Sequence, residues 1–285
     1  MLRKKTLFLA FIAVLFSFPL QPALAADPLM IFCGAAFKKP MEEVSNLYKQ
    51  KTGGTVNVIY AGVGTLFSQI LLSKQGDVFV VPSADIIQRA KVKGVIMSGS
   101  VRDIAYVAPC INTQKGNPKN IRSLKDLAKP GIRVGLANPE IVYIGAIAEE
   151  IIGKNLSSDL KQALQKNIVT YVEDFNKLST LLVLKQVDAV IGMHFLEGWY
   201  PDKVATVKFK PAEVSRIGSV QTAVITYTTQ KDEADKFITF LTSEDVQSIF
   251  RKYNYFGTPK EAFSWVGATV PIGGEFNVKK GRQGK

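Results

Sequence analysis

Three clusters of small residues follow apolar, strand-like runs in this sequence: Gly34-Ala35-Ala36, the loop from Gly62 to Thr65, and the turn from Pro139 to Gly145. Each cluster precedes a helical pattern. The first turn of a helix exposes unpaired backbone N–H groups and a partial positive charge, so it binds an anion without a side-chain cation. Small residues let a ligand approach that backbone closely. The clusters predict an anion site made of peptide amides, although Gly and Ala are also common at such turns for structural reasons alone.

The other residues that could do chemistry are few. The single histidine, His194, follows an apolar run and either hydrogen-bonds the ligand, with a charge when protonated, or packs as a hydrogen-bonded neutral ring. Glu140, Glu173 and Asp174 are the acidic residues near the expected site, and helix capping accounts for Asp174 better than acid–base catalysis does.

The sequence holds two cysteines, Cys33 and Cys110, which exclude a Cys-rich metal cluster. Whether they form a disulfide stays open, because bonding needs Cα atoms within about 7 Å. The chain also lacks the GxxxxGK[ST] phosphate-binding loop. We therefore predict a binding protein rather than an enzyme, with no cofactor and no metal site apart from a metal carried as an oxyanion.

Alternating strand and helix patterns must position these loops. Strands are predicted at 29–33, 56–60 and 77–81, with helices at 39–51 and 66–73 between them. The rhythm restarts after residue 110, and the further elements expected are a short helix at 124–128, strands at 133–136, 168–171 and 188–192, and helices at 144–152, from 174, at 233–241 and at 243–253. Such alternation is typical of mainly parallel sheets covered by helices.

Two extended segments, 103–111 and 218–227, have no helical period and would cross between two α/β units. They predict a first lobe of residues 26–108 plus 222–285 and a second lobe of residues 109–221. The predicted fold class is α/β, with two lobes that each contain a mixed, mainly parallel sheet.

The composition fits an exported globular protein. The chain has 285 residues, is 47% hydrophobic and 21% charged, and carries a formal net charge of +12. Residues 1–25 combine a basic start, an apolar run too short for the ~20 residues that span a bilayer, and Ala23-Leu24-Ala25, which together predict a cleaved signal peptide. Export and scattered lysines argue against nucleic acid as the partner of the excess positive charge.

The order of motifs resembles the periplasmic molybdate-binding proteins of ABC transporters. The resemblance begins with IFCGAAFKKPMEEVSNLYKQKTG, VNVIYAGVGTLFSQI and GDVFVVPSAD, continues with LKDLAKPGIRVGLANPE and VEDFNKLSTLLVLKQVDAVIG, and ends with FITFLTSEDVQSIFRKYNYF. It runs from Ile31 to Phe256. It implies the type 2 periplasmic-binding-protein fold, with two crossover strands, a small oxyanion such as molybdate or tungstate in the interlobe cleft, and delivery from the periplasm to a membrane permease. Nothing in the sequence suggests oligomerisation, so we expect a monomer.

The family's ligand-binding positions can be laid on this sequence. Its first-loop serine falls near Ala36, its second-loop serine near Val63 or Gly64, and its tyrosine near Gly192. The expected ligand-binding residues are Gly34, Ala35, Ala36, Val63, Gly64, Thr65, Tyr143, Ile144, Phe175, Asn176 and His194. The alternatives are another small anion, namely sulfate or a phosphorylated or carboxylated acid, and a surface antigen or adhesin on the same fold; an enzyme ranks below these.

Overall fold

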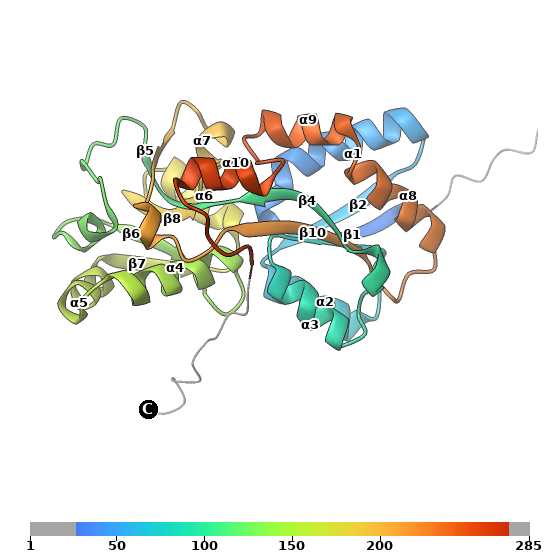
Figure 1. Cartoon of the computed structure of the whole chain (residues 1–285), viewed down its shortest axis with the longest axis horizontal. Helices are drawn as coiled ribbons and strands as arrows, with labels where there is room; N and C mark the ends of the chain where they lie inside the picture. Colours follow the sequence, from blue (N-terminus) through green and yellow to red (C-terminus); the bar gives the residue numbers. More distant parts are fainter. Residues whose placement is uncertain (1–26, 274–285) are drawn as a thin grey trace, which may run out of the picture.

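A computed structural model of the chain describes residues 27–273, which form two five-stranded sheets flanked by helices (Figure 1). The first sheet has the order β2 (Val56–Ala61), β1 (Leu29–Gly34), β3 (Val78–Val81), β10 (Gly218–Val224), β4 (Arg102–Val107). The second has the order β7 (Ile168–Val172), β6 (Val134–Ala137), β8 (Ala189–Met193), β5 (Pro109–Gln114), β9 (Val204–Val207). In each sheet three parallel strands adjoin two antiparallel ones. These mixed sheets confirm the predicted fold class.

Helices cover both sheets. Those of the first lobe are α1 (Lys38–Thr52), α2 (Val63–Ser73), α3 (Ala84–Val92), α8 (Lys231–Leu241) and α9 (Glu244–Lys252). Those of the second are α4 (Tyr143–Asn155), α5 (Ser158–Asn167), α6 (Phe175–Val183) and the short α7 (Leu196–Trp199), while α10 (Pro259–Val266) packs on β4. Short 3-10 helices lie at η1 (Ala35–Phe37), η2 (Ser98–Ser100), η3 (Leu124–Ala128) and η4 (Pro211–Glu213).

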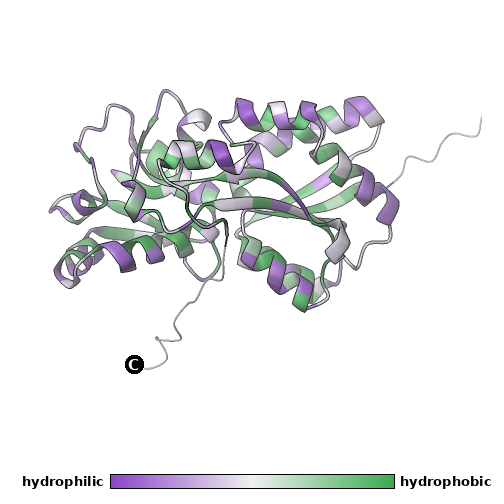
Figure 2. Cartoon of the chain, in the orientation of Figure 1, coloured by the Kyte–Doolittle hydropathy of each residue, from purple (hydrophilic) through white to green (hydrophobic). Residues whose placement is uncertain are grey.

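The apolar periodicity explains how these elements pack. β1 and β3 are continuous apolar runs because both faces of their sheet are covered, whereas α9 buries only Val246, Ile249 and Phe250 on one side. Figure 2 shows the result, with hydrophobic strands inside and hydrophilic stretches on the outer helices. The buried apolar side chains form one cluster that continues through both lobes.

Two connections join the sheets. The first is the buried residue Ala108 between β4 and β5, and the second is the segment 208–217 between β9 and β10. All of β10, from Gly218 onward, pairs within the first sheet. The lobe boundaries given above remain a prediction.

Four α-helices, α3, α5, α7 and α10, were not predicted from the sequence. α5 buries only Leu164, so its apolar pattern is too sparse to mark a helix face. The predicted signal peptide lies outside the described residues, and between residues 27 and 273 no helix is long and apolar enough to cross a membrane.

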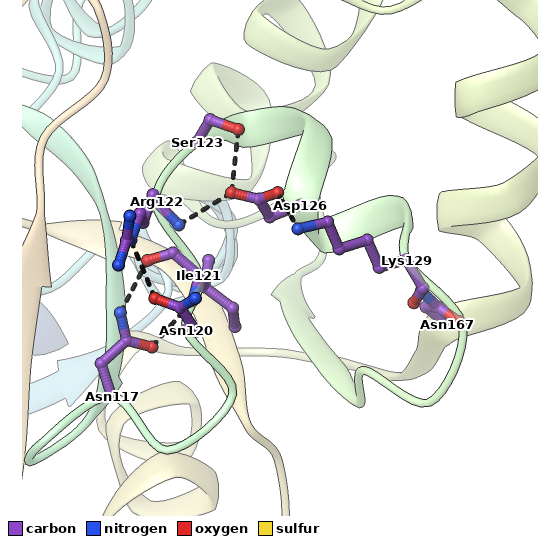
Figure 3. Close-up of polar contacts among 8 residues, drawn as sticks. All are labelled: Asn117, Asn120, Ile121, Arg122, Ser123, Asp126, Lys129 and Asn167. Carbon is purple, nitrogen blue, oxygen red and sulfur yellow. Dashed lines mark hydrogen bonds and ion pairs between the residues drawn. The ribbon is translucent and has the colours of Figure 1, made fainter.

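The β5–β6 connection is held by side chains that bond to its own backbone (Figure 3). The Asn117 amide donates to the Ile121 carbonyl oxygen and accepts from the Ile121 N–H, at 2.7 and 3.0 Å. Further along, Asp126 accepts from the Arg122 N–H at 2.8 Å, the Ser123 hydroxyl at 3.0 Å and the Lys129 ammonium at 2.6 Å. Burial alone would raise the pKa of Asp126, but these donors lower it to about 2. Asp126 therefore fixes this connection as a carboxylate.

Asp126→Asn should lower the free energy of unfolding by about 1–2 kcal/mol at pH 7, because a neutral amide cannot replace three charge-assisted acceptor contacts. Because the folded pKa of Asp126 lies below the unfolded value, wild type should lose this advantage as the pH falls from about 4 to 2. Urea unfolding across this pH range measures both effects. The matched control is Asp202→Asn, at an exposed carboxylate with no side-chain bond recorded to the described residues. Equal losses in the two variants at pH 7 would contradict the role of Asp126.

Candidate functional site

A small chamber lies between the two sheets, at the carboxyl ends of their parallel strands, where ligands of such sheets bind. β1, β2 and β3 end there on one side, and the starts of α4 and α6 and the end of β8 meet them from the other. Its volume is ≈ 20 Å³. We call it the amide chamber, and its lining residues are Gly34, Ala35, Ala36, Ala61, Gly62, Val63, Pro82, Val142, Tyr143, Ile144, Phe175 and Met193.

Three helices that begin at the amide chamber have no side-chain cap. The residues before η1, α2 and α4 are Gly34, Gly62 and Val142, and none accepts a bond through its side chain. Starts without a side-chain cap also occur elsewhere, as at α8 and α9, whereas α3, α5, α6 and α10 are each capped by a Ser, Asp or Thr side chain. First-turn N–H groups have no partner within their own helix. Three helix starts therefore flank one small space, whose accessible wall in this conformation is formed almost entirely by apolar atoms. Their partial positive charge would favour an anion there when the lobes separate and the N–H groups become accessible.

The lobes touch through backbone atoms beside the amide chamber. The Gly64 N–H donates to the Ile141 carbonyl oxygen at 3.0 Å. A Cβ atom at Gly62 would lie 2.5 Å from the Glu173 carbonyl oxygen and 2.8 Å from that of Ile141. One at Gly64 would lie 2.9 Å from the Ile141 Cα atom. Only glycine permits this approach, so the structure is a closed conformation.

The closed amide chamber is smaller than an oxyanion. Its ≈ 20 Å³ is close to the volume that one water molecule needs. The Gly64 N–H, one of the expected anion donors, is already bonded across the lobes. An oxyanion can therefore enter only when the lobes separate from the closed position.

Tyr143 supplies the polar side chain of the amide chamber. It is 6% exposed, and its hydroxyl is buried with no hydrogen-bond partner among the described residues. The Arg216 guanidinium lies 5.9 Å from its ring centre. Burial raises the pKa of Tyr143, against the lowering effect of Arg216, so the phenol is neutral at physiological pH.

A larger cavity of ≈ 570 Å³ adjoins the amide chamber between α3 and α4. It shares Val63, Val142 and Tyr143 with the amide chamber, and we call it the side cavity. Gly64 lines the side cavity rather than the amide chamber.

Two further contacts, which we call the clasps, join the two lobes. Lys39 of α1 donates to the Trp199 carbonyl oxygen at 2.5 Å, and its ammonium lies 3.9 Å from the ring centre of Tyr200. Arg216, in the second connection, pairs with Asp85 of α3 at 2.8 Å and with Glu150 of α4 at 2.7 Å. Both contacts join residues of different lobes, and each therefore favours the closed conformation.

Seven of the residues expected to bind ligand line the amide chamber, namely Gly34, Ala35, Ala36, Val63, Tyr143, Ile144 and Phe175. Thr65, Asn176 and His194 line neither the amide chamber nor the side cavity. Asn176 follows Phe175 at the start of α6 and points about 100° away from it around the helix axis, and Thr65, two residues after Val63 in α2, points about 200° away from Val63.

His194 has the contacts of a packing histidine. Its Nδ1 atom accepts from the Ala108 N–H at 3.1 Å, and its ring stacks on Phe256 with centroids 3.9 Å apart. Burial lowers the pKa of His194 to about 3, so the ring is neutral beside the first interlobe connection.

Several residues at the site were missed by sequence reasoning. Gly62 lies in the small-residue loop identified above. The two glycines of that loop, Gly62 and Gly64, could have indicated that the backbone of the other lobe comes close at both positions. Met193 and Arg216 carried no local signal, because their positions depend on pairing between distant segments.

Residues 27–273 contain neither a cluster of metal ligands nor an ionised thiol. No group of three or more His, Cys, Asp or Glu residues in that range could hold a metal ion. Cys33 and Cys110 are both free and buried, and burial raises the pKa of each thiol, so both are protonated.

The two sheets, the paired connections and the interlobe chamber define the fold of the type 2 periplasmic-binding proteins. The Azotobacter vinelandii periplasmic molybdate-binding protein has a similar structure, with a TM-score of 0.69 and 18% sequence identity over 80% of this chain and 98% of that one. Residues 29–256 match the model of the family "Bacterial extracellular solute-binding protein", and the chain belongs to this family.

Several curated proteins are similar to this chain in sequence. A "Putative binding protein" of Haemophilus influenzae is 29% identical over 167 residues, which are 59% of this chain and 66% of that protein. The molybdate-binding protein ModA of Mycobacterium tuberculosis is 31% identical over 127 residues, 44% of this chain and 48% of that protein. The chain therefore spans about half to two thirds of the length of these relatives. Both names are those of binding proteins rather than enzymes.

Gly62→Ala should destabilise the closed conformation by about 1–3 kcal/mol, because the added methyl group overlaps two carbonyl oxygens of the other lobe. Small-angle X-ray scattering should give a larger radius of gyration than wild type. Gly99→Ala is the matched control in the same lobe, since a Cβ atom there meets nothing within 4 Å. An unchanged scattering curve for Gly62→Ala would rule out this contact as the limit on closure.

His194→Gln should remove a pH dependence of stability. The unfolded histidine titrates near pH 6.5 and the folded one at about 3, so the unfolded chain binds more protons between these values. Wild type should lose up to about 1.4 kcal/mol per pH unit below pH 6.5 from this group. Because the chain has one histidine, the difference between the unfolding free energies of wild type and variant, measured from pH 7 to 4, reports on this group alone. Parallel curves would contradict a buried neutral His194.

Proposed function

We propose that this chain captures a small oxyanion, molybdate or tungstate, in the amide chamber and presents it to the membrane permease of an ABC transporter. The observation that carries the proposal is the convergence of three helix starts, at η1, α2 and α4, without side-chain caps. Membership of a bacterial extracellular solute-binding family supports the transport role and a periplasmic location. The chain acts as a monomer, without a cofactor and without catalysis.

Backbone amides would hold the anion. The first-turn N–H groups at Ala36, Val63, Tyr143 and Ile144 are the donors that we assign, with the partial positive charge of their helices behind them. No Lys or Arg lines the amide chamber among the described residues. Fixed neutral donors reject a protonated anion, because its O–H group presents a donor where an acceptor is needed. The distance between the lobes then selects the oxyanion by size.

Binding follows a hinge motion about the two connections between the sheets. In the open form the Gly64 N–H separates from the Ile141 carbonyl oxygen and becomes free for the ligand. The Lys39 and Arg216 clasps then re-form as the lobes close, to a position wider than the empty one by the size of the anion.

A second candidate ligand is a phosphorylated or carboxylated acid. The side cavity favours it, because its ≈ 570 Å³ falls within the range of about 300–1,000 Å³ for small-molecule sites.

Isothermal titration calorimetry of the full chain with molybdate, tungstate, sulfate and phosphate tests the proposal. We expect one-to-one binding of molybdate or tungstate without turnover, and weaker binding of sulfate and phosphate. Binding of a cation or a sugar, with no response to any anion, would overturn it.

Ala36→Ser sharpens this test. The serine hydroxyl adds a donor near the position where the first-loop serine of the family that the sequence resembles is expected, so molybdate binding should strengthen by about 0.5–1.5 kcal/mol, or several-fold in Kd. Ala212→Ser, at an exposed position on η4, is the control and should leave the Kd unchanged. Equal affinities for Ala36→Ser and wild type would remove Ala36 from the anion site.

A further inference from the structure

Exposed cations gather at the end of the second lobe that lies away from the amide chamber. They belong to the β5–β6 connection, the end of α5 and the turn between α6 and β8, and we call them the basic end: Lys119, Arg122, Lys125, Lys129, Arg133, Lys166 and Lys185. Hydrogen bonds join these segments. Asn167 donates to the Lys129 carbonyl oxygen at 2.6 Å, and Arg133 donates to that of Lys185 at 3.1 Å. The fold therefore brings together cations that are scattered along the sequence.

The carboxylates of these segments neutralise only part of the basic end. Asp126 pairs with Lys129 at 2.6 Å, and Asp188 pairs with Arg133 at 2.9 Å. Figure 3 shows Asp126 facing Lys129 and its own connection. The other five cations have no carboxylate partner among residues 27–273. Asp159 lies at the other end of α5, about 10 Å along the helix from Lys166. The basic end and its two paired carboxylates thus carry a formal net charge of +5.

The helices on the outside of the first lobe show the opposite arrangement. Together α1, α8 and α9 carry eight cations and seven carboxylates. Six of these cations form an ion pair with a carboxylate. An excess of unpaired positive charge is therefore a local property of the basic end rather than a general one of this surface.

The basic end lies too far from the amide chamber to act on its ligand. Arg133, Asn167 and Asp188 directly precede β6, β7 and β8, so the basic end is at the amino ends of these parallel strands. The amide chamber is at their carboxyl ends, and Figure 1 shows α5 at the left end of the molecule. The five residues of β8 span about 15 Å, whereas physiological salt screens exposed charges over about 8 Å. The basic end therefore faces a different partner.

Exposed apolar side chains adjoin the basic end. Val169 follows Asn167 by two residues and is 53% exposed, and Leu184 directly precedes Lys185 and is 59% exposed. Tyr171, on the same side of β7 as Val169, is 47% exposed. A soluble polyanion leaves such side chains in water. A lipid bilayer accepts both kinds of group, because its headgroups attract cations and its interface takes up apolar and tyrosine side chains.

We propose that the basic end binds reversibly to the surface of an anionic lipid bilayer. Its cations contact the phosphate of the headgroups, and Val169 and Leu184 enter the interface beside them. Clusters of about four to eight Lys or Arg residues are typical of surfaces that bind anionic lipid. Membership of an extracellular family favours a bilayer over nucleic acid as the anionic partner. The attachment leaves the amide chamber uncovered, because the chamber lies at the opposite ends of the strands.

Vesicle co-sedimentation of the exported protein tests this inference. The probes are phosphatidylcholine vesicles with and without about 30 mol% phosphatidylglycerol. We expect binding to the anionic vesicles at about 50 mM NaCl, its loss at about 500 mM, and none to the neutral vesicles. Lys125→Gln, Lys166→Gln and Lys185→Gln together should lower the partition coefficient at least about tenfold, because three unpaired charges are removed.

The matched control removes the same charge elsewhere. It combines Lys49→Gln, Lys93→Gln and Lys260→Gln, at exposed lysines that have no ion pair between residues 27 and 273, and should keep most of the wild-type binding. Equal losses in the two triple variants, or no preference for anionic vesicles, overturn the inference.

A second pair of variants separates a bilayer from a soluble polyanion. Leu184→Ser should weaken binding to anionic vesicles several-fold, whereas Leu72→Ser, at an exposed leucine of α2 in the first lobe, should not. Binding to polyglutamate without binding to anionic vesicles overturns the lipid assignment. Molybdate affinity, measured by calorimetry on the same variants, should stay at its wild-type value, so failure of this inference leaves the proposed function standing.

Discussion

The contact between two stretches of backbone, Gly62–Gly64 in one lobe and Ile141 with Glu173 in the other, limits how closely the lobes approach. Since no side chain stands between them, peptide geometry sets how closely the lobes approach at this point. The three uncapped helix starts lie directly beside this contact. A shift of a few tenths of an ångström in the lobe contact therefore changes the distance between opposing sets of amide donors.

The two clasps, at Lys39 and at Arg216, are formed by different kinds of interaction. Lys39 loses hydration and gains the Trp199 carbonyl and the Tyr200 ring, and burial lowers its pKa. Arg216 is buried between two carboxylates, where desolvation offsets much of the Coulomb attraction. Neither clasp needs to be strong for it to help align the lobes, because the residues in each come from different parts of the two-lobed fold. The neutral His194 at the connection adds no competing charge near physiological pH.

The sequence predicts the loops of the site better than their relation to each other. Apolar runs end at Gly34 and Ala61, and small residues follow them, so the positions of the anion loops can be read locally. Arg216 and the side cavity arise only when α3, α4 and the second connection meet, which no local pattern encodes. Likewise, α5 buries one leucine and leaves little periodicity to detect. Sequence reasoning therefore missed the features that depend on tertiary contacts between distant segments.

An anion held by amides alone has a consequence for release as well as capture. A buried ion pair resists separation, because breaking it leaves an uncompensated charge. Backbone donors exposed by opening are instead met by water, which replaces each hydrogen bond at little cost. The cations Arg89 and Lys91 line the side cavity rather than the amide chamber, so they can attract an anion toward the cleft without holding it there. Under the proposed function, this separation of attraction from binding would let a movement of the lobes alone release the ligand.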